Sequence, residues 1–377
     1  MLNFIKKIIL FLFPLGLIFV FPLVVYYFGR EYYSTEQIIA AQTTKPGVIY
    51  GTGYTSAEAF YKQQLLARID PEVLVLGASR SAEFRREFFS RPTKFFNAGC
   101  TSQHGAGNLA TFLKNLPVGD HVKLIILSLD PIEFVAGSPR LNRENSKADD
   151  PFWRLTNFLA GGWRKVYVDY FVHKFTLSEL INKAKTTGNV GVQAIINNDG
   201  YRADGSYQYA KAESDSNHRQ DLAAAVNLQL DSAKNHGDSP EYGRVVATDT
   251  LDSLVASLKL CQEKNIYVIG LFSPHPAEIF QKISSPDYPY RDMVESLPVK
   301  LSKIFSDAGF SFYDLSDLRT VGANNSEFLD WIHGTDKLDL RVMIYLAEKN
   351  QQLKKYVNLD NLKAMLKNSP GDFLILN

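Results

Sequence analysis

Short apolar runs alternate with amphipathic stretches over most of the chain. The runs are rich in β-branched and aromatic residues, which is typical of strands buried on both faces of a parallel sheet. The stretches between them, such as LATFLKNL and TLDSLVASLKLCQEK, have the apolar spacing of helices that bury one face. The pattern therefore predicts a doubly wound α/β sheet. The five expected strands are Val73–Leu76, Lys94–Phe96, Val122–Leu129, Ile266–Phe272 and Ser311–Leu315.

A long interval interrupts this alternation between the third and the fourth strand. About 130 residues lie there, whereas a crossover needs only about a dozen. We expect residues 135–250 to form a helical insertion, either a substrate-facing cap or a docking surface for a partner. Because it follows the carboxyl end of a strand, where parallel sheets bind ligands, we expect it near the site. Its segment NNDGYRADGSYQY suits flat polar ligands and a solvated loop about equally.

The amino-terminal part of the chain has a different pattern. From Ile8 to Phe28 it is apolar and carries no charge, which is enough for a helix across a bilayer core of about 30 Å. Pro14 and Pro22 are compatible with a membrane helix, and Tyr26–Phe28 are expected to form an aromatic collar at its outer end. The run is longer than a signal-peptide core, lacks an AxA-like exit and is apolar on every face. We therefore favour an uncleaved anchor over a signal peptide or a buried soluble helix.

Charges on either side of the run predict its orientation. Lys6 and Lys7 precede it, whereas Arg30 after it is offset by Glu31, so the amino terminus is expected in the cytoplasm. The expected location is a bacterial cytoplasmic membrane, with the rest of the chain in the periplasm or outside the cell. The expected parts are a cytoplasmic tip and anchor (1–30), a connector (31–70), an α/β domain (71–356) and a carboxyl-terminal tail (357–377).

Composition excludes several functional classes. The 377 residues are 45% apolar and carry 41 basic and 40 acidic side chains, a net charge of +1, so there is no basic field for nucleic acid. The histidines show no metal-ligand spacing, and His104 and His275 are more often expected to be surface or structural residues than part of a site. Cys100 and Cys261 either form a disulfide or are both buried thiols, and we favour buried thiols.

The first candidate for chemistry lies in the segment VLVLGASRSAEF. Ser79 follows a buried strand and opens an expected helix, so its hydroxyl lies at the carboxyl edge of the sheet, near N–H groups that favour negative charge. Gly77 allows the sharp turn before it. Ser79 could equally serve only as a helix N-cap. The neighbouring Arg80 either binds an anionic substrate or pairs with Glu83 or Glu87.

The second candidate is the segment DWIHGTDKLDL near the carboxyl terminus. Asp330 and His333 are three residues apart, so on one turn the carboxylate can reach Nδ1 of the imidazole and leave Nε2 as a base. Trp331 between them is expected to pack rather than to bind a sugar. Asp336 is expected to be the N-cap of the last long helix. Taken alone, this pattern is more often an incidental exposed turn.

Together, these two segments resemble the SGNH, or GDSL-like, hydrolases. In that family a GxS motif after the first strand supplies the nucleophile and a DxxH motif before the last helix supplies the other two members of a triad. Gly77–Ser79 and Asp330–His333 match these motifs, and Phe96–Ser102 resembles the family's second block. The resemblance covers residues 71–130 and 255–350. It implies a three-layer α/β/α fold with a parallel five-stranded, flavodoxin-like sheet. The implied catalytic residues are Ser79, Asp330 and His333.

The chain departs from the family at two positions of the oxyanion hole. The second block usually has a glycine where the best alignment places Ser102, and Gly99 or Gly105 are the alternatives. The third block normally ends in GxND, whose asparagine donates to the oxyanion. Here Asp130 stands at that place, and an ionised carboxylate accepts rather than donates.

The chain resembles the branch of this family that is anchored in membranes and modifies cell-envelope polymers, by D-alanylation of teichoic acid or O-acetylation of polysaccharide. The resemblance implies a serine esterase or O-acyltransferase that acts on an acylated envelope polysaccharide or teichoic-type polymer. It also implies a multipass membrane O-acyltransferase as a partner and no metal or organic cofactor. The alternative is a catalytically silent accessory subunit that docks on such an acyltransferase or binds the polymer.

Overall fold

The computed structural model of the chain describes most of its residues and forms two compact units. The described residues are 16, 18–55, 58–99, 113, 121–136, 151–214, 224 and 242–374. The first unit is built from residues within 1–61, 145–203 and 207–211, and the second from residues within 62–144, 204–206 and 212–377.

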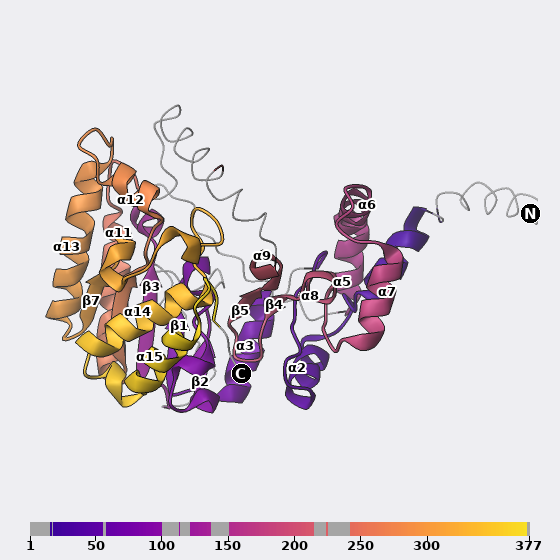
Figure 1. Ribbon diagram of the computed structural model, residues 1–377, viewed down its shortest axis with the longest axis horizontal. Coiled ribbons are helices and arrows are strands. Elements are labelled where there is room, and N and C mark those ends of the chain that lie inside the picture. Colours follow the sequence, from indigo (N-terminus) through magenta and orange to yellow (C-terminus); the bar gives the residue numbers. More distant parts are fainter. Residues whose placement is uncertain are drawn as a thin grey trace, which may run out of the picture. The chain divides into compact units, whose positions relative to one another are not determined.

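The second unit is built around a parallel sheet (Figure 1). Its strands lie in the order β2-β1-β3-β6-β7 and every neighbouring pair is parallel. Counted along the chain this is the order 2-1-3-4-5 of flavodoxin-like sheets. The predicted α/β fold with a parallel five-stranded sheet is therefore confirmed. The strands are β1 (Val73–Leu76), β2 (Phe95–Asn97), β3 (Leu124–Leu129), β6 (Tyr267–Phe272) and β7 (Ser311–Asp314).

Helices cover both faces of this sheet. Ile269 and Leu271 of β6 share a core cluster with Leu340 at the start of the last long helix. Gly270 points to the opposite face, where a Cβ would lie 2.3 Å from the ring of Phe305. Because successive side chains of a strand alternate between faces, α13 and α14 lie on opposite sides. The helices of this unit are α11 (Thr248–Glu263), α12 (Ala277–Ile283), α13 (Arg291–Asp307), α14 (Asp336–Lys349) and α15 (Leu359–Asn368).

The first turn of α14 differs from the prediction in its cap. The side chain of Thr335 accepts a hydrogen bond from the N–H of Leu338 at 3.3 Å, so Thr335 is the N-cap. The expectation that Asp336 caps the helix is wrong, because Asp336 is already its first residue. Its carboxylate instead pairs with Arg85 at 3.1 Å and accepts the N–H of Leu374 at 3.0 Å.

The first unit is mainly helical. Its core contains Phe158, Val166 and Leu180, together with Val25 and Tyr26 from the end of the amino-terminal helix, residues 18–28. The ring of Tyr26 lies 4.6 Å from that of Phe158, so it packs inside the unit rather than in an outer collar. The other elements are α2 (Thr35–Thr44), α5 (Pro151–Asn157), a π-helical turn (Phe158–Gly162), α6 (Trp163–Phe171), α7 (Leu177–Thr186), α8 (Val192–Asn197), β4 (Asp199–Tyr201) and β5 (Tyr207–Tyr209). Two further helices, α3 (Glu58–Ile69) and α9 (Ala210–Ser214), contain residues of both units.

Residues expected to be a connector fold together with part of the expected insertion. Tyr50 forms backbone bridges with Val190 and Tyr201. The buried carboxylate of Glu31 accepts the N–H of Gly53 at 2.7 Å and that of Val192 at 2.9 Å. Because these bonds satisfy a buried charge, they tie the segment after the amino-terminal helix to residues of the insertion.

Parts of the predicted organisation fall on residues that the structure does not describe. Residues 8–15 and 17 of the expected anchor lie outside the described residues, as does nearly all of the expected helix RQDLAAAVNLQLDSAK. Within the described residues, no helix combines the length and the apolar character that crossing a membrane requires.

Cys261 offers a test of the second unit's core. It lies on α11 as a fully buried free thiol, and burial raises its pKa to about 12, whereas Cys100 lies outside the described residues. Because the thiolate is the reactive form, we expect no iodoacetamide adduct at Cys261 in the native protein at about pH 8. Full modification is expected once the chain is unfolded in guanidinium. The mass of the Cys261 peptide reports both states, and rapid alkylation of the native protein would contradict the described packing of α11.

Candidate active site

The candidate nucleophile sits on a tight turn at the carboxyl end of β1. Gly77 has φ +144°, and a Cβ there would lie 2.5 Å from the carbonyl oxygen of Ser128 on β3. Only glycine fits this passage. Ser79 then opens a single 3-10 turn, Ser79–Ser81, and a second such turn follows at Arg86–Phe88. The expectation that Ser79 opens a helix in the segment SAEFRREFF is therefore wrong.

Asn97, the last residue of β2, explains this irregular backbone. Its fully buried amide group donates to the carbonyl oxygens of Ser81 at 2.7 Å and Phe84 at 2.9 Å, while its Oδ1 accepts the N–H of Gly99 at 2.9 Å. Carbonyl groups that point to Asn97 are not available for a regular helix. The backbone N–H of Asn97 in turn donates to the carbonyl oxygen of Asp204 at 2.8 Å. Asn97 thus holds the nucleophile segment in place.

Asn97 lies in the segment Phe96–Ser102, for which the motifs predicted no role of this side chain. The available signal was a polar residue directly after two buried phenylalanines, at the end of a strand. A polar side chain that is buried at such a place has to find partners, and here the partners are backbone groups of the neighbouring turn.

Asp330 and His333 form one compact turn before α14. Asp330 Oδ1 accepts the N–H of Ile332 at 2.8 Å and that of His333 at 2.7 Å, while Oδ2 lies 2.7 Å from His333 Nδ1. Burial raises the pKa of Asp330, but the hydrogen bonds and charge of His333 outweigh it and leave this pKa below its usual value. The carboxylate is therefore ionised at neutral pH and holds the imidazole in one orientation.

Backbone hydrogen bonds hold the turn that carries Asp330 and His333 in place. Leu329 N–H donates to the carbonyl oxygen of His333 at 2.8 Å, and Thr335 N–H donates to that of Glu327 at 3.0 Å. The buried Glu327 side chain pairs with Arg341 of α14 at 2.8 Å. Because both ends of the turn are tied to the helix, the position of His333 is set before any ligand binds.

The structure brings the two candidate segments together. Ser79 Oγ lies 2.8 Å from His333 Nε2, although the two residues are 254 positions apart in the chain. Because the Asp330 carboxylate accepts at Nδ1, the neutral ring carries its proton there and Nε2 accepts from the Ser79 hydroxyl. The three predicted catalytic residues therefore form a continuous hydrogen-bonded chain, and this chain is suited to activate a nucleophile.

Arg80, next to the candidate nucleophile Ser79, lies in a buried cluster. Its Nε is 3.5 Å from Asp130 Oδ1, and its Nη1 is 3.4 Å from His275 Nε2. Burial, followed by the charge of Arg80, holds the pKa of His275 well below its usual value, so the ring is neutral and can accept. Glu87, one of the two partners proposed for Arg80, pairs instead with Arg85 at 2.9 Å. His275 thus belongs to the surroundings of the site.

Asp130 directly follows the last residue of β3 and so lies at the carboxyl end of that strand. Burial raises its pKa, while the charges of Arg80 and His333 act in the opposite direction. Its Oδ1 accepts no hydrogen bond from the described residues. Of the oxyanion candidates, Gly99 donates its N–H to Asn97 and is thereby engaged, whereas Ser102 and Gly105 lie outside the described residues.

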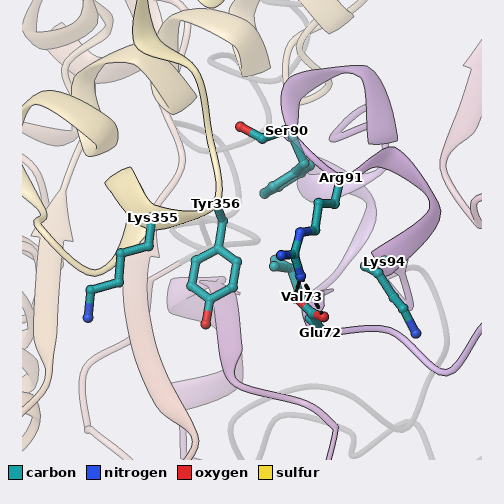
Figure 2. A pocket seen from close by; sticks show the side chains of 8 residues that line it. Glu72, Val73, Ser90, Arg91, Lys94, Lys355 and Tyr356 are labelled. Carbon is teal, nitrogen blue, oxygen red and sulfur yellow. Dashed lines mark hydrogen bonds and ion pairs between the residues drawn. The ribbon is translucent and has the colours of Figure 1, made fainter.

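A surface cavity of about 210 Å³ lies elsewhere in the second unit. Figure 2 shows its polar rim of Glu72, Arg91, Lys94 and Lys355, with Arg91 paired to Glu72 at 3.1 Å. Glu72 directly precedes β1, whereas Ser79 follows it. The cavity therefore opens at the amino edge of the sheet, opposite to the triad, and takes no part in the argument about catalysis.

Within the described residues, no group of histidine, cysteine and carboxylate side chains is arranged to hold a metal ion. No protein-family model matches the chain, and a search of curated proteins finds no relative.

The bonds made by Asn97 generate a prediction for stability. Asn97→Asp keeps the shape of the side chain but replaces a donor by an acceptor that faces carbonyl oxygens. We expect the free energy of unfolding to fall by about 1–3 kcal/mol or more, the cost of unsatisfied buried groups, as measured by urea denaturation. Asn361→Asp, at an exposed position of α15, is the control and should change it by less than about 0.5 kcal/mol. Equal effects of the two substitutions would show that Asn97 does not hold the segment.

Proposed function

We propose that the chain is a serine ester hydrolase or O-acyltransferase of the SGNH type, with Ser79 as nucleophile, His333 as base and Asp330 as orienting carboxylate. The observation that carries this proposal is the unbroken path from Asp330 Oδ2 through His333 to Ser79 Oγ, with contacts of 2.7 and 2.8 Å. Two motifs that resemble one family supply the three residues, in the order and at the sheet edge that the family uses. A chance pair of surface motifs would not meet at hydrogen-bond distance.

In the proposed first step, Ser79 Oγ attacks an acyl carbonyl carbon while its proton passes to His333 Nε2. The carbonyl electron pair moves to the oxygen, giving a tetrahedral oxyanion. Asp330 stabilises the imidazolium that forms. When the carbonyl reforms, the bond to the leaving alkoxy group breaks, and this group takes the proton from Nε2. The acyl group then remains on Ser79.

In the second step, water or the hydroxyl of an acceptor gives its proton to His333 Nε2 and attacks the acyl carbonyl. Collapse of this intermediate returns the proton to Ser79 and releases the acid or the new ester. Both outcomes use the same three residues, so the choice between hydrolysis and transfer depends on what reaches the acyl-enzyme. The oxyanion donors in this proposal are backbone N–H groups of Ser79 and of the 99–105 loop other than Gly99.

The proposed substrate is an acylated envelope polysaccharide or a teichoic-type polymer, with a multipass membrane O-acyltransferase as partner. Support comes from the resemblance to membrane-anchored envelope proteins and from the charge-free run between Ile8 and Phe28. The proposed location is the cytoplasmic membrane, with one span, an internal amino terminus and the sheet unit outside.

Active-site labelling and substitution test the chemistry. We expect a fluorophosphonate probe to label the Ser79 peptide, and Ser79→Ala, His333→Ala and Asp330→Asn each to lower the hydrolysis of p-nitrophenyl acetate by about 10³-fold or more. Ser90→Ala, an exposed serine on the same segment, is the matched control and should leave the rate unchanged. Near-normal turnover by Ser79→Ala would rule out the proposed mechanism and favour the accessory role.

Protease accessibility tests the proposed orientation. Because Lys6 and Lys7 precede the apolar run, a tag at the amino terminus should stay protected in intact spheroplasts, while added protease should digest residues 71–377. Lysis of the spheroplasts before digestion is the control and should expose the tag. Protection of residues 71–377 in intact spheroplasts would exclude both this orientation and an envelope polymer as substrate.

A further inference from the structure

The first unit exposes a group of large apolar side chains at the end of α6. Val168 is 57% exposed, Phe171 70% and Val172 58%. Side chains three and four positions apart share one face of a helix, so these residues form a continuous patch, called here the α6 patch. Exposed apolar groups of this kind mark a surface that binds another protein or a membrane.

Helix α6 packs against the amino-terminal helix, residues 18–28, through a face that does not carry the α6 patch. The ring of Phe19 is 5.1 Å from Trp163, and the ring of Phe21 is 4.8 Å from Tyr170. The hydroxyl of Tyr167 donates to the carbonyl oxygen of Ile18 at 2.7 Å. These contacts fix α6 against the outer part of the charge-free run, so that whatever surrounds this part of the run also meets α6.

The amino-terminal helix has an exposed apolar stripe of its own. Val20 is 51% exposed and Leu23 37%, and Tyr27 continues the same face at 62%. Val25 and Tyr26, on the other side, are buried in the core of the unit. One side of the helix therefore packs against the rest of the first unit. The other side is exposed and carries apolar and aromatic side chains.

The length of the run indicates how deep α6 lies. A helix across the hydrocarbon of a bilayer needs about 20 residues, and 20 residues counted from Ile8 end at Tyr27. The contacts with α6 already begin at Ile18, about ten residues or about 15 Å along such a helix. Because the run meets α6 before it has crossed the bilayer, α6 has to enter the outer leaflet beside it.

The composition around the α6 patch fits the outer interface of a bilayer. Trp163, Tyr167 and Tyr170 lie on the side of α6 that contacts the amino-terminal helix, and Trp and Tyr are enriched at membrane interfaces. Basic residues stand at both ends of α6: Arg164 at its start, and Lys174 just after it. Long cationic side chains in the leaflet can extend to the headgroups, where anionic lipids attract them.

We propose that α6 lies in the outer leaflet, with Val168, Phe171 and Val172 in contact with lipid acyl chains. The patch thereby extends the anchor and fixes the first unit to the membrane surface. This inference rests on the proposed location of the chain in a membrane, but not on the proposed chemistry at Ser79.

The test measures the contact of single positions with lipid in the full chain. In a background with Cys100→Ser and Cys261→Ala, the variants V172C, V168C, V20C and V299C are each labelled with an environment-sensitive fluorophore. The proteins are reconstituted into vesicles of phosphatidylcholine and phosphatidylglycerol that contain lipid with a nitroxide on the upper acyl chain. Val299 is the matched control, because it is a valine of α13 in the other unit and is 69% exposed.

We expect loss of emission through the nitroxide lipid at positions 172, 168 and 20, and none at position 299. Quenching at 20 without quenching at 172 and 168 would overturn the inference and leave the anchor intact. Shielding of 172 from aqueous iodide without lipid quenching would point to a second copy of the chain and would also overturn it. If position 20 is not quenched either, the proposal that the amino-terminal run is a membrane anchor is contradicted as well. Ester hydrolysis measured in the same vesicles reports separately on Ser79.

Discussion

The hydrogen bond between Ser79 and His333 joins two segments that are 254 residues apart, and the architecture of the second unit serves to make it possible. Parallel strands deliver their carboxyl ends to one edge. β1 ends just before Ser79, and the turn that carries His333 is tied to the first turn of α14. Neither segment has a regular structure of its own at the site. Their precision comes from Asn97 on one side and Asp330 on the other.

The sheet and the hydrogen-bonded arrangement of Ser79, His333 and Asp330 were predictable because they depend on local patterns. Buried parallel strands are short continuous apolar runs, and Ser79, Asp330 and His333 occur in two compact motifs that resemble one family. The predicted sheet is present, with strand ends shifted by one or two residues, as at Leu124. The role of Asn97 was not predictable in this way. It depends on three carbonyl groups from another part of the chain that only the folded backbone brings to its amide.

The features that differ from their prediction have related physical causes. Helical spacing after Ser79 favoured a helix, but tertiary hydrogen bonds to Asn97 prevail over that local propensity. Thr335 and Asp336 are both good caps by type, and only the backbone angles decide between them. For Arg80 the sequence left an anionic substrate, Glu83 or Glu87 as partners; Glu87 pairs with Arg85 instead, and the contacts of Arg80 include Asp130 and His275, which are distant in sequence. The partner of a buried charge is set by the fold and need not be close in sequence.

The turn at Asp204–Ser206 limits which parts of this chain can be exchanged by recombination. The strands β4 and β5 on either side belong to the first unit, but the turn itself belongs to the second. There Asp204 accepts the N–H of Asn97 and that of Arg86, each at 2.8 Å. Residues 145–211 therefore cannot be replaced without also affecting the second unit. Replacing these residues by an unrelated insert removes the hydrogen-bond acceptor of the Asn97 and Arg86 N–H groups. The segment that carries Ser79 would then lose this stabilisation unless the new insert places an acceptor at the same position.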